Sequence, residues 1–457
     1  MECATLHFAD TYGAVARFPN PSGINGAAGW LFLNHPDLIQ YVCMEKVPNY
    51  TERYLPDIYA YVTDGQGILG SGGAYNKAQR KLCMPPFQKK ASLQNFASSV
   101  VERADYLTSI WQSEGKFTAD MAVQMQRLTL DIVGVVAFSH DFKQLRGMAE
   151  YGVLAKEDEI PTDRVLHDIN VAQDIMGRVF VTPLPVLKAL RAMRAPFMIT
   201  MENAFADMKD AVMPIIQERR EAKQRGETKE DLLDSLLEMQ AELQETGEGF
   251  TDGELWEDVH DVMGAGHETT ASTLSACLYT LSQHPEIDRK VQAELEAVLG
   301  GRLPTYEDFD QLVYTKQVVK EVLRLYPPIP IFPRLAKEDD VLPTGHKVSA
   351  GEVIFMSSYA MGRSEMIWED PLTFDPSRFD EEVEATRHRF QWVPFGGGPR
   401  MCMGAGFAML STTLVLSTLV QKYKFKAVKD QGPVIPIKYD ITMYFPDDML
   451  MTVSPRE

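Results

Sequence analysis

The chain has 457 residues, of which 45% are hydrophobic and 24% are charged, a composition that excludes a disordered chain and is typical of a globular protein. The 64 acidic residues outnumber the 45 lysines and arginines, and a formal net charge of −19 argues against nucleic acid as a partner. The five cysteines are scattered without a Cys-x-x-Cys pair, which argues against structural zinc and favours a reducing compartment.

The first part of the chain, to about residue 60, mixes short apolar runs with proline and glycine. Within it, WLFLNHPDLIQYVC predicts a strand followed by a helix around Pro36. From about Lys77 to Trp256 the apolar spacing is mostly helical, and we interpret the charged stretch Glu218 to Lys229 as a solvated helix end and loop. The stretch Arg178 to Met201 alternates apolar and basic residues, which predicts a lid over a pocket or, as second choice, an amphipathic surface resting on a bilayer.

One predicted helix is unusually long. Thr251-x-x-Glu254 has the spacing of a capping box, and nothing ends the helix before His284-Pro285. Gly264 and Gly266 lie in its middle, where each glycine costs roughly 1 kcal/mol relative to alanine. A local reason for these two glycines is therefore expected.

Two shorter helices are predicted next, from Pro285 to Leu299 and from Tyr314 to Tyr326, before residues 329 to 358 change to a period of two that predicts a small antiparallel sheet. We therefore predict a mainly α fold with a small β-rich region from about 1–60 and 329–358, in one domain spanning 1–457. No window is apolar enough for a membrane span, and Ala405 to Val420 is interpreted as a buried core helix. No signal or transit segment is recognisable, so we expect a cytoplasmic protein, or a plastid or membrane-associated one if a preceding segment is missing.

The strongest motif is FGGGPRMCMGAG, residues 395 to 406, which precedes that apolar helix. Cys402 falls where a glycine-rich loop enters a helix N-terminus, and the unpaired N–H groups there stabilise a thiolate that can ligate iron. Gly398 and Gly404 would let the backbone approach a flat cofactor, Phe395 can cover the sulfur and Arg400 can pair with a carboxylate.

This run fits F-x-x-G-x-R-x-C-x-G and resembles the haem-binding loop of the cytochrome P450 family, the haem-thiolate monooxygenases. The resemblance implies that family's fold, with haem b between the long central helix and the cysteine-loop helix and with Cys402 as the axial iron ligand. The segment beginning Ala265-Gly266 resembles the family's oxygen-activation segment. Ala265 and Gly266 would then lie at the haem, a widened helix turn would admit O2, and Glu268 and Thr269 would relay protons.

The resemblance also assigns charged residues. Glu321 and Arg324 share a helix face, and Arg378 would complete the family's structural Glu-Arg-Arg network. The haem propionates would be bound by Arg80, Arg334 and Arg400. Asn76 stands four residues before Arg80, where the family usually has tryptophan, so one propionate contact is in doubt.

Substrate-contacting positions carried over from the family are all apolar or aromatic, which favours a hydrophobic substrate: besides Ala265, these are Ile68, Leu69, Val262, Ile331, Phe332, Tyr444 and Phe445. Segments such as RLPTYEDFDQLVYTKQVVKEVLRLYPP look most like plastid carotenoid-ring hydroxylases and also like fatty-acid hydroxylases. We expect insertion of one oxygen atom of O2 into a C–H bond of a carotenoid-like or lipid-like molecule.

Two alternatives remain open: a haem-thiolate isomerase or dehydratase that needs no external electrons, and a non-catalytic haem protein. The Glu268-Thr269 pair favours the monooxygenase. Its electron donor would be a ferredoxin or flavoprotein reductase, because Lys77, Arg80, Lys81, Lys89 and Lys90 form a local basic cluster in an acidic chain. The G-x-G-x-x-G run within residues 64–70 lacks the acidic residue of a dinucleotide site, so we interpret it as a mobile loop beside the haem.

Overall fold

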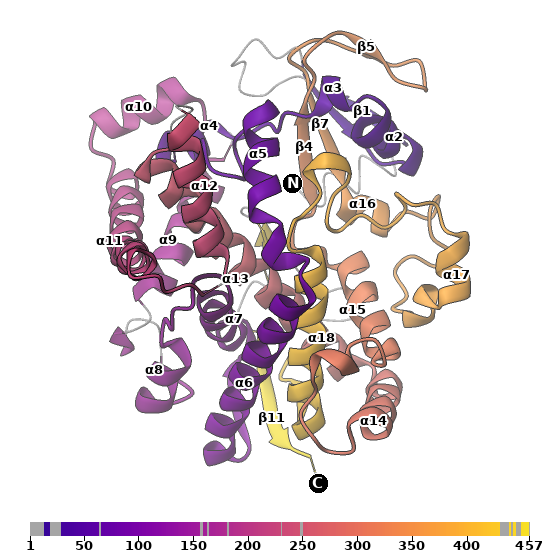
Figure 1. Cartoon of the computed structure of the whole chain (residues 1–457). Helices are drawn as coiled ribbons and strands as arrows, with labels where there is room; N and C mark the ends of the chain where they lie inside the picture. Colours follow the sequence, from indigo (N-terminus) through magenta and orange to yellow (C-terminus); the bar gives the residue numbers. More distant parts are fainter. Residues whose placement is uncertain are drawn as a thin grey trace.

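The computed structural model describes residues 13–18, 29–63, 65–155, 159–161, 164–180, 182–229, 231–246, 250–429, 438–439, 442–444 and 449–456. Its helices are α2 Pro36–Gln40, α3 Val47–Tyr50, α4 Asp57–Val62, α5 Gly73–Cys83, α6 Lys90–Glu114, α7 Met121–Phe138, α8 Gln144–Tyr151, α9 Arg164–Arg178, α10 Leu184–Ala192, α11 Pro196–Gln224, α12 Leu232–Thr246, α13 Asp252–Gln283, α14 Pro285–Leu299, α15 Val313–Leu325, α16 Ser358–Gly362, α17 Glu381–Thr386 and α18 Ala405–Lys422 (Figure 1). Its strands are β1 Val15–Phe18, β2 Trp30–Leu33, β3 Phe117–Asp120, β4 Ile331–Leu335, β5 Asp340–Val341, β6 Lys347–Val348, β7 Val353–Ser357, β8 Tyr423–Ala427, β9 Lys438–Tyr439, β10 Met443–Tyr444 and β11 Leu450–Pro455. The predicted mainly helical fold with a small β-rich region is confirmed.

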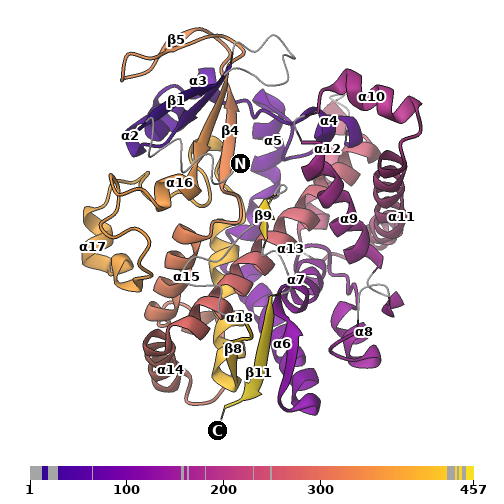
Figure 2. The same ribbon diagram turned by 180° about the vertical axis from the view of Figure 1, so that it is seen from behind.

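The helix α13 runs through the middle of the molecule in both views (Figures 1 and 2). Its capping box is complete: Glu254 N–H donates to Thr251 Oγ1 at 3.1 Å, and Thr251 N–H donates to Glu254 Oε2 at 2.7 Å. The predicted bounds of this helix are therefore confirmed. It is regular α-helix over its whole length, so the widened turn expected near Gly264 and Gly266 is not observed.

The largest hydrophobic core lies between α6, α7, α13, α15 and α18. Helix α7 lies along α13, and α18 lies along α6. The predicted helices after α13 are confirmed within one residue, as α14 and α15. Helix α7 has the length and apolar composition of a membrane span, but 78% of its residues are buried inside the protein, as in the core helix of a folded domain.

The main sheet has the strand order β1-β2-β7-β4; β1, β7 and β4 are labelled in Figure 1. Strand β4 pairs antiparallel with β7, as predicted, but β2 pairs parallel with β7, so the sheet is mixed rather than antiparallel. All four residues of β2, Trp30–Leu33, are buried, which is typical of a strand covered on both faces. The period of two within 329–358 could not reveal a partner that lies more than 300 residues earlier.

The stretch Glu218 to Lys229 was expected to be solvated, and this is wrong for Arg219. Its side chain is buried and donates to Asp231 Oδ1 at 2.7 Å, to Asp234 Oδ1 at 3.0 Å and to the carbonyl of Phe138 at 2.9 Å. A charge can be buried here because two carboxylates and a carbonyl compensate it. These bonds join α11 to the start of α12 and the end of α7.

The stretch Arg178 to Met201 comprises the end of α9, the whole of α10 and the start of α11. It leaves the apolar side chains of Val186, Met193 and Phe197 exposed at the edge of the molecule, where Figure 1 shows α10. The exposed groups suit both interpretations of this stretch, a lid or a bilayer-resting surface.

Candidate functional site

The loop before α18 presents Cys402 at the helix N-terminus. Its backbone is fixed, because Cys402 N–H donates to the carbonyl of Phe395 at 2.9 Å and a short 3-10 helix, Gly398–Arg400, precedes it. Cys402 is accessible, although protein atoms closely surround its sulfur. Burial raises the pKa of the thiol, while a hydrogen bond from Gly404 N–H and the charges of Arg53 and Arg80 lower it. Burial has the larger effect, so the pKa of Cys402 is raised in the haem-free chain, and these groups only lower the cost of forming a thiolate.

The two glycines of this loop have different surroundings. Gly398 has φ of +67°, and a methyl group on it would collide with the carbonyl oxygen of Cys43, so this glycine allows the loop to cross the chain near Cys43. A methyl group on Gly404 would meet no heavy atom within 4 Å. Of the two, only Gly404 borders open space, as expected of a residue that a flat cofactor approaches.

The middle of α13 also borders open space. Ala265 is exposed although it lies halfway along a central helix, and a methyl group on Gly264 would meet no heavy atom within 4 Å. Gly266 points elsewhere, because a methyl group on it would lie 2.7 Å from Cγ2 of Val133 on α7. The structure therefore gives Gly266 a packing role between two helices rather than a position at the cavity.

The next turn of α13 carries the predicted proton-relay pair. Glu268 is buried, and Thr269 Oγ1 donates to the carbonyl of Ala265 at 2.7 Å, which leaves the lone pairs of that oxygen as acceptors. Sequence reasoning gave no role to the neighbouring His267. It is fully buried, neither ring nitrogen has a hydrogen-bond partner among the described residues, and burial lowers its pKa to about 4. It is therefore neutral at pH 7.

Four arginines converge beside the cysteine loop: Arg53, Arg80, Arg334 and Arg400. They donate to backbone carbonyls, as Arg80 does to Met401 at 2.6 Å and Arg53 does to Arg400 at 3.0 Å, and within the described residues none forms an ion pair with a carboxylate. Burial lowers the pKa of all four, and repulsion from neighbouring arginines lowers it further at Arg53, Arg334 and Arg400, that of Arg400 to about 10. Such a cluster is suited to an anionic ligand.

Arg53 was not predicted. The sequence offers no signal for it, because it stands in an irregular segment between α3 and α4 and about 350 residues before the cysteine loop. Asn76, which replaces the usual tryptophan, instead donates to the carbonyl of Ile68 at 2.9 Å and to Ser71 Oγ at 3.0 Å. Its side chain holds a loop and is not part of the arginine cluster.

The network of Glu321, Arg324 and Arg378 is brought together at the base of this site. Arg324 Nε and Nη2 each donate to a carboxylate oxygen of Glu321 at 2.7 Å, and Arg378 Nε lies 3.5 Å from Glu321 Oε1. Arg324 also donates to the carbonyls of Gly362, Pro371 and Thr373. It thereby ties α15 to the segment that leads to the cysteine loop.

The predicted substrate contacts fall into two groups. Leu69 is exposed and Val262 is partly buried on α13, one turn before Gly266. Ile68 is largely buried, and Ile331 and Phe332 pack in the hydrophobic clusters of the main sheet. The side chain of Tyr444 and the whole of Phe445 lie outside the described residues.

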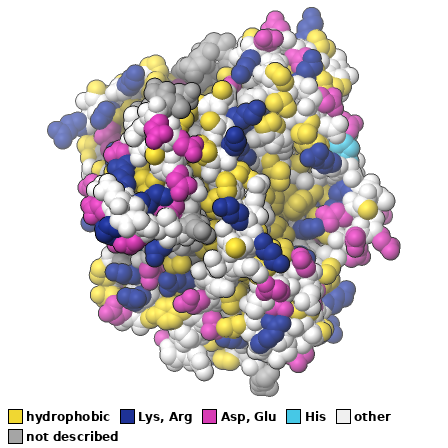
Figure 3. Space-filling model, in the orientation of Figure 1, with side chains coloured by type: hydrophobic (Ala, Val, Ile, Leu, Met, Phe, Trp, Pro, Cys, Tyr) yellow, Lys and Arg dark blue, Asp and Glu magenta, His cyan; other side chains and the backbone are white. Residues whose placement is uncertain are grey.

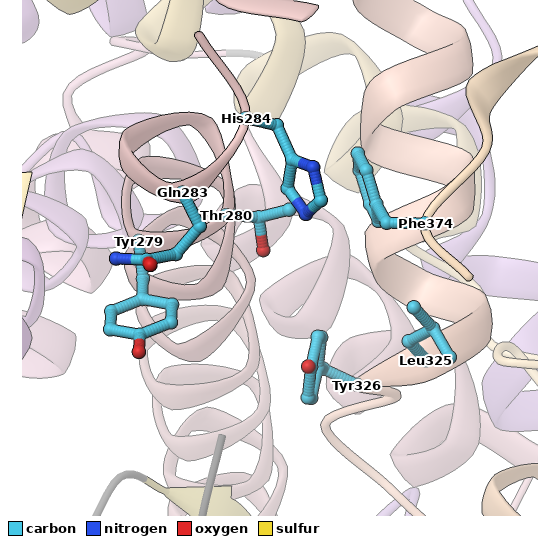
Figure 4. Close-up of a pocket in the computed structure, with 7 residues that line it drawn as sticks. All are labelled: Tyr279, Thr280, Gln283, His284, Leu325, Tyr326 and Phe374. Carbon is cyan, nitrogen blue, oxygen red and sulfur yellow. The ribbon is translucent and has the colours of Figure 1, made fainter. Parts of the chain in front are cut away.

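A separate small pocket lies at the far end of α13, lined by Tyr279, Thr280, Gln283, His284, Leu325, Tyr326 and Phe374 (Figure 4). At a rise of 1.5 Å per residue, Thr280 is about 22 Å along the helix from Ala265. His284 stacks on Phe374, which partly fills this pocket. It therefore does not belong to the cysteine site.

Comparison with known proteins decides the family. The sequence model described as Cytochrome P450 matches residues 23–446. The chain belongs to the cytochrome P450 family.

Several curated cytochromes P450 resemble the chain over most of its length. It is 28% identical to Carotene epsilon-monooxygenase, chloroplastic, of Arabidopsis thaliana, over 94% of the chain and 78% of that protein. It is 29% identical to Cyclooctat-9-en-7-ol 5-monooxygenase of Streptomyces melanosporofaciens, over 86% and 80%. It is also 28% identical to Bifunctional cytochrome P450/NADPH--P450 reductase 2 of Bacillus subtilis, over 98% of the chain and 40% of that protein.

Membership makes the chain a monooxygenase of the cytochrome P450 type and implies a haem-thiolate cofactor. The residues present fit such a group. The accessible Cys402 sulfur supplies a thiolate, the open space at Gly404 and Ala265 accepts a flat ring, and the arginine cluster, without carboxylate partners among the described residues, suits the two propionates.

Proposed function

We propose that the chain inserts one oxygen atom of O2 into a C–H bond of a carotenoid-like or lipid-like substrate, using haem b bound through Cys402. The observation that carries the proposal is a cluster of four arginines beside the accessible Cys402, of which Arg334 and Arg400 are buried and Arg53 and Arg80 are partly buried, with no carboxylate partner among the described residues. A cysteine with only a structural role would need neither an accessible side chain nor neighbouring arginine charges.

In this proposal the chain holds the haem from two sides. Cys402 gives the thiolate, which Gly404 N–H stabilises, and Arg53, Arg80, Arg334 and Arg400 bind the propionates. The haem, when bound, supplies O2 activation, in which two electrons and two protons accompany insertion of one oxygen atom and release of the other as water. Glu321, Arg324 and Arg378 hold the scaffold below the loop.

Protons would reach the cavity through α13. We assign the Glu268 carboxyl group to carry a proton towards the cavity. Thr269 Oγ1 is assigned to accept a hydrogen bond there while it donates its own proton to the carbonyl of Ala265. The neighbouring His267 is neutral and buried, so it adds no charge beside Glu268.

The substrate is proposed to be apolar because Leu69, Val262 and Ala265 present only hydrocarbon groups to the cavity. The carotene and cyclooctatenol monooxygenases among the relatives act on molecules of this polarity. A fatty-acid chain would fit the same surface, so carotenoids and fatty acids are the two classes to compare first.

Electrons are proposed to arrive from a ferredoxin or a flavoprotein reductase; one relative is joined to a reductase in one chain. Lys77, Lys81, Lys89 and Lys90 are exposed around α5 and the start of α6, and Figure 3 shows lysine and arginine side chains near the middle of that face. An acidic partner would be attracted there, most strongly at low salt. Reversing Lys77 and Lys81 to glutamate should slow reduction of the iron without altering substrate affinity.

The test of the proposed function is a binding screen read by the haem spin-state change, with β-carotene, palmitate and ergosterol side by side. Compounds that shift the spectrum are then incubated with a reductase, NADPH and labelled O2, and label in the product supports the proposal. Rearrangement of a lipid hydroperoxide without reductase, and with no labelled product, would instead support the isomerase.

A further inference from the structure

The loop that carries the glycine-rich run is held by carboxylates of α13. Four consecutive backbone N–H groups donate to three side chains: those of Gln66 and Gly67 to Glu257 Oε2, both at 2.8 Å, that of Ile68 to Asp258 Oδ1 at 2.6 Å, and that of Leu69 to Asp261 Oδ2 at 2.8 Å. The expectation of a mobile loop is therefore not supported by its contacts.

The opposite edge of the same loop is held by donors. The carbonyl of Leu69 accepts from Arg53 and from Arg400, both at 3.1 Å, and the carbonyl of Ser71 accepts from Arg400 at 2.8 Å. The loop thus lies between the carboxylates of α13 and the arginine cluster. The carboxylates bind N–H groups of the loop on one side, and the arginines bind its carbonyl groups on the other. Both sides therefore hold the loop in one position.

The fit between the loop and α13 leaves no spare room. A methyl group on Gly67 would lie 2.6 Å from Asp261 Oδ2 and 3.1 Å from Cβ of Glu257. Asp258 is fully buried, and its burial and the nearby Asp261 and Glu257 raise its pKa, so the carboxylates repel one another unless N–H donors lie between them. Tyr59 adds a further donor to Asp261.

The Gln66–Leu69 loop lies next to the proposed substrate pocket. Asp261 lies four residues, about one helical turn, before the exposed Ala265. Leu69, at the end of the clamped segment, is exposed, and its carbonyl touches the arginines beside Cys402. The clamped loop therefore spans the distance between the two walls of the proposed substrate pocket.

We propose that Glu257, Asp258 and Asp261 are positioning residues that clamp the Gln66–Leu69 loop to α13 and thereby set how readily bulky ligands enter the pocket. The inference rests on the proposed location of the haem and its pocket. It predicts that releasing the loop speeds the entry of large ligands and leaves small ones unaffected.

Two variants should release the loop from α13, one by a change on the helix and one by a change on the loop. Asp258→Asn weakens the bond to Ile68 N–H without changing side-chain size, and Gly67→Ala pushes the loop away from α13 while every carboxylate stays in place. Matched controls on the same helix are Asp252→Asn and Gly253→Ala. Among the described residues, Asp252 accepts hydrogen bonds from Arg220 and Gln240 alone, and a methyl group on Gly253 would meet only Thr251 Oγ1, at 3.5 Å.

The first measurement is hydrogen exchange of the four loop amides, which needs no knowledge of the substrate. Weakening of the hydrogen bonds between the loop and α13 predicts roughly tenfold faster exchange at 66–69 in both release variants. The controls should exchange at the wild-type rate. Wild-type exchange in both release variants would overturn the clamp.

The second measurement is stopped-flow binding of 4-phenylimidazole and of imidazole to the haem-loaded protein. We expect roughly tenfold faster association of 4-phenylimidazole in both release variants and an unchanged rate for imidazole. Equal changes for the two azoles, or faster amide exchange with no change for 4-phenylimidazole, would overturn control of entry. A wild-type protein that binds neither azole would instead overturn the proposed haem site, while amide exchange still decides the clamp.

Discussion

Replacing Arg400 with glutamine should destabilise the haem-loaded protein more than the haem-free protein. Arg400 is only 4% exposed, and its burial, together with Arg334 and Arg80, lowers its pKa to about 10. Since one pKa unit corresponds to about 1.4 kcal/mol, keeping this guanidinium charged in the haem-free chain costs about 3 kcal/mol. A bound haem propionate is proposed to offset this cost.

The variant removes that cost but also the two hydrogen bonds from the charged guanidinium to the carbonyls of Ser71 and Leu69, each of which contributes about 1.5 to 3 kcal/mol. The haem-free Arg400→Gln protein should therefore be as stable as wild type or less stable, by up to about 3 kcal/mol in urea unfolding. The haem-loaded variant loses a charged hydrogen bond worth about 1.5 to 3 kcal/mol, so haem should dissociate about 10 to 100 times faster.

Haem dissociation is measured by transfer to excess apomyoglobin, and stability is measured by urea unfolding of the haem-free protein. Arg53→Gln should behave in the same way, whereas Arg17→Gln, which removes an ion pair with Glu352 outside the arginine cluster, should leave haem loss unchanged. Equal destabilisation of both states by Arg400→Gln, or haem loss at the wild-type rate, would refute the reasoning.

Four further outcomes are expected. Cys402→Ala should lose the red-shifted Soret band of the reduced carbonyl adduct; a variant that keeps this band has another iron ligand. Glu321→Ala leaves buried arginines unpaired and should be less stable by about 3 to 5 kcal/mol, so a variant with full haem content and the wild-type urea midpoint contradicts the network. Thr269→Val should bind haem and substrate, but more of the electrons from NADPH should appear in hydrogen peroxide and fewer in product. An unchanged ratio of product to NADPH consumed would show that the hydroxyl group serves only its bond to the carbonyl of Ala265. The hydrogen bond from Arg302 lowers the pKa of Asp308 to about 2. This carboxylate therefore stabilises the fold above its unfolded pKa near 4, and the stabilisation is lost as the pH falls towards 2. Asp308→Asn should flatten the decline of the urea midpoint between pH 4 and pH 2, and an unchanged slope would contradict the role of the Arg302–Asp308 pair.

The sequence predicted those features that depend on neighbouring residues. The capping box at Thr251, the helix that starts at Pro285 and the Glu321-Arg324 pair all come from spacings of three or four residues, and the structure contains each of them. The family assignment followed from a short motif around Cys402, and the family comparison confirms it.

Features that join distant segments were not predictable in this way. Nothing adjacent to Arg53 marks it as a partner of Arg400, and no local pattern shows that α13 carboxylates bind the backbone of residues 66–69, because a backbone N–H has no sequence signature. The buried Arg219 was misjudged for the same reason, since its two aspartates lie beyond the end of its own helix. Charge patterns predict exposure well only where the compensating groups are nearby in the chain.

The parallel pairing of β2 with β7 affects how the protein is made. Roughly 320 residues separate the two strands, so a ribosome that adds 5 to 20 residues per second completes β7 roughly 15 to 60 s after β2. During that interval the fully apolar Trp30–Leu33 strand can pair with β1 but keeps one open edge, which is a site for aggregation or chaperone binding. Cys402 is synthesised later still, so the two strands of the sheet are available before the proposed haem ligand is.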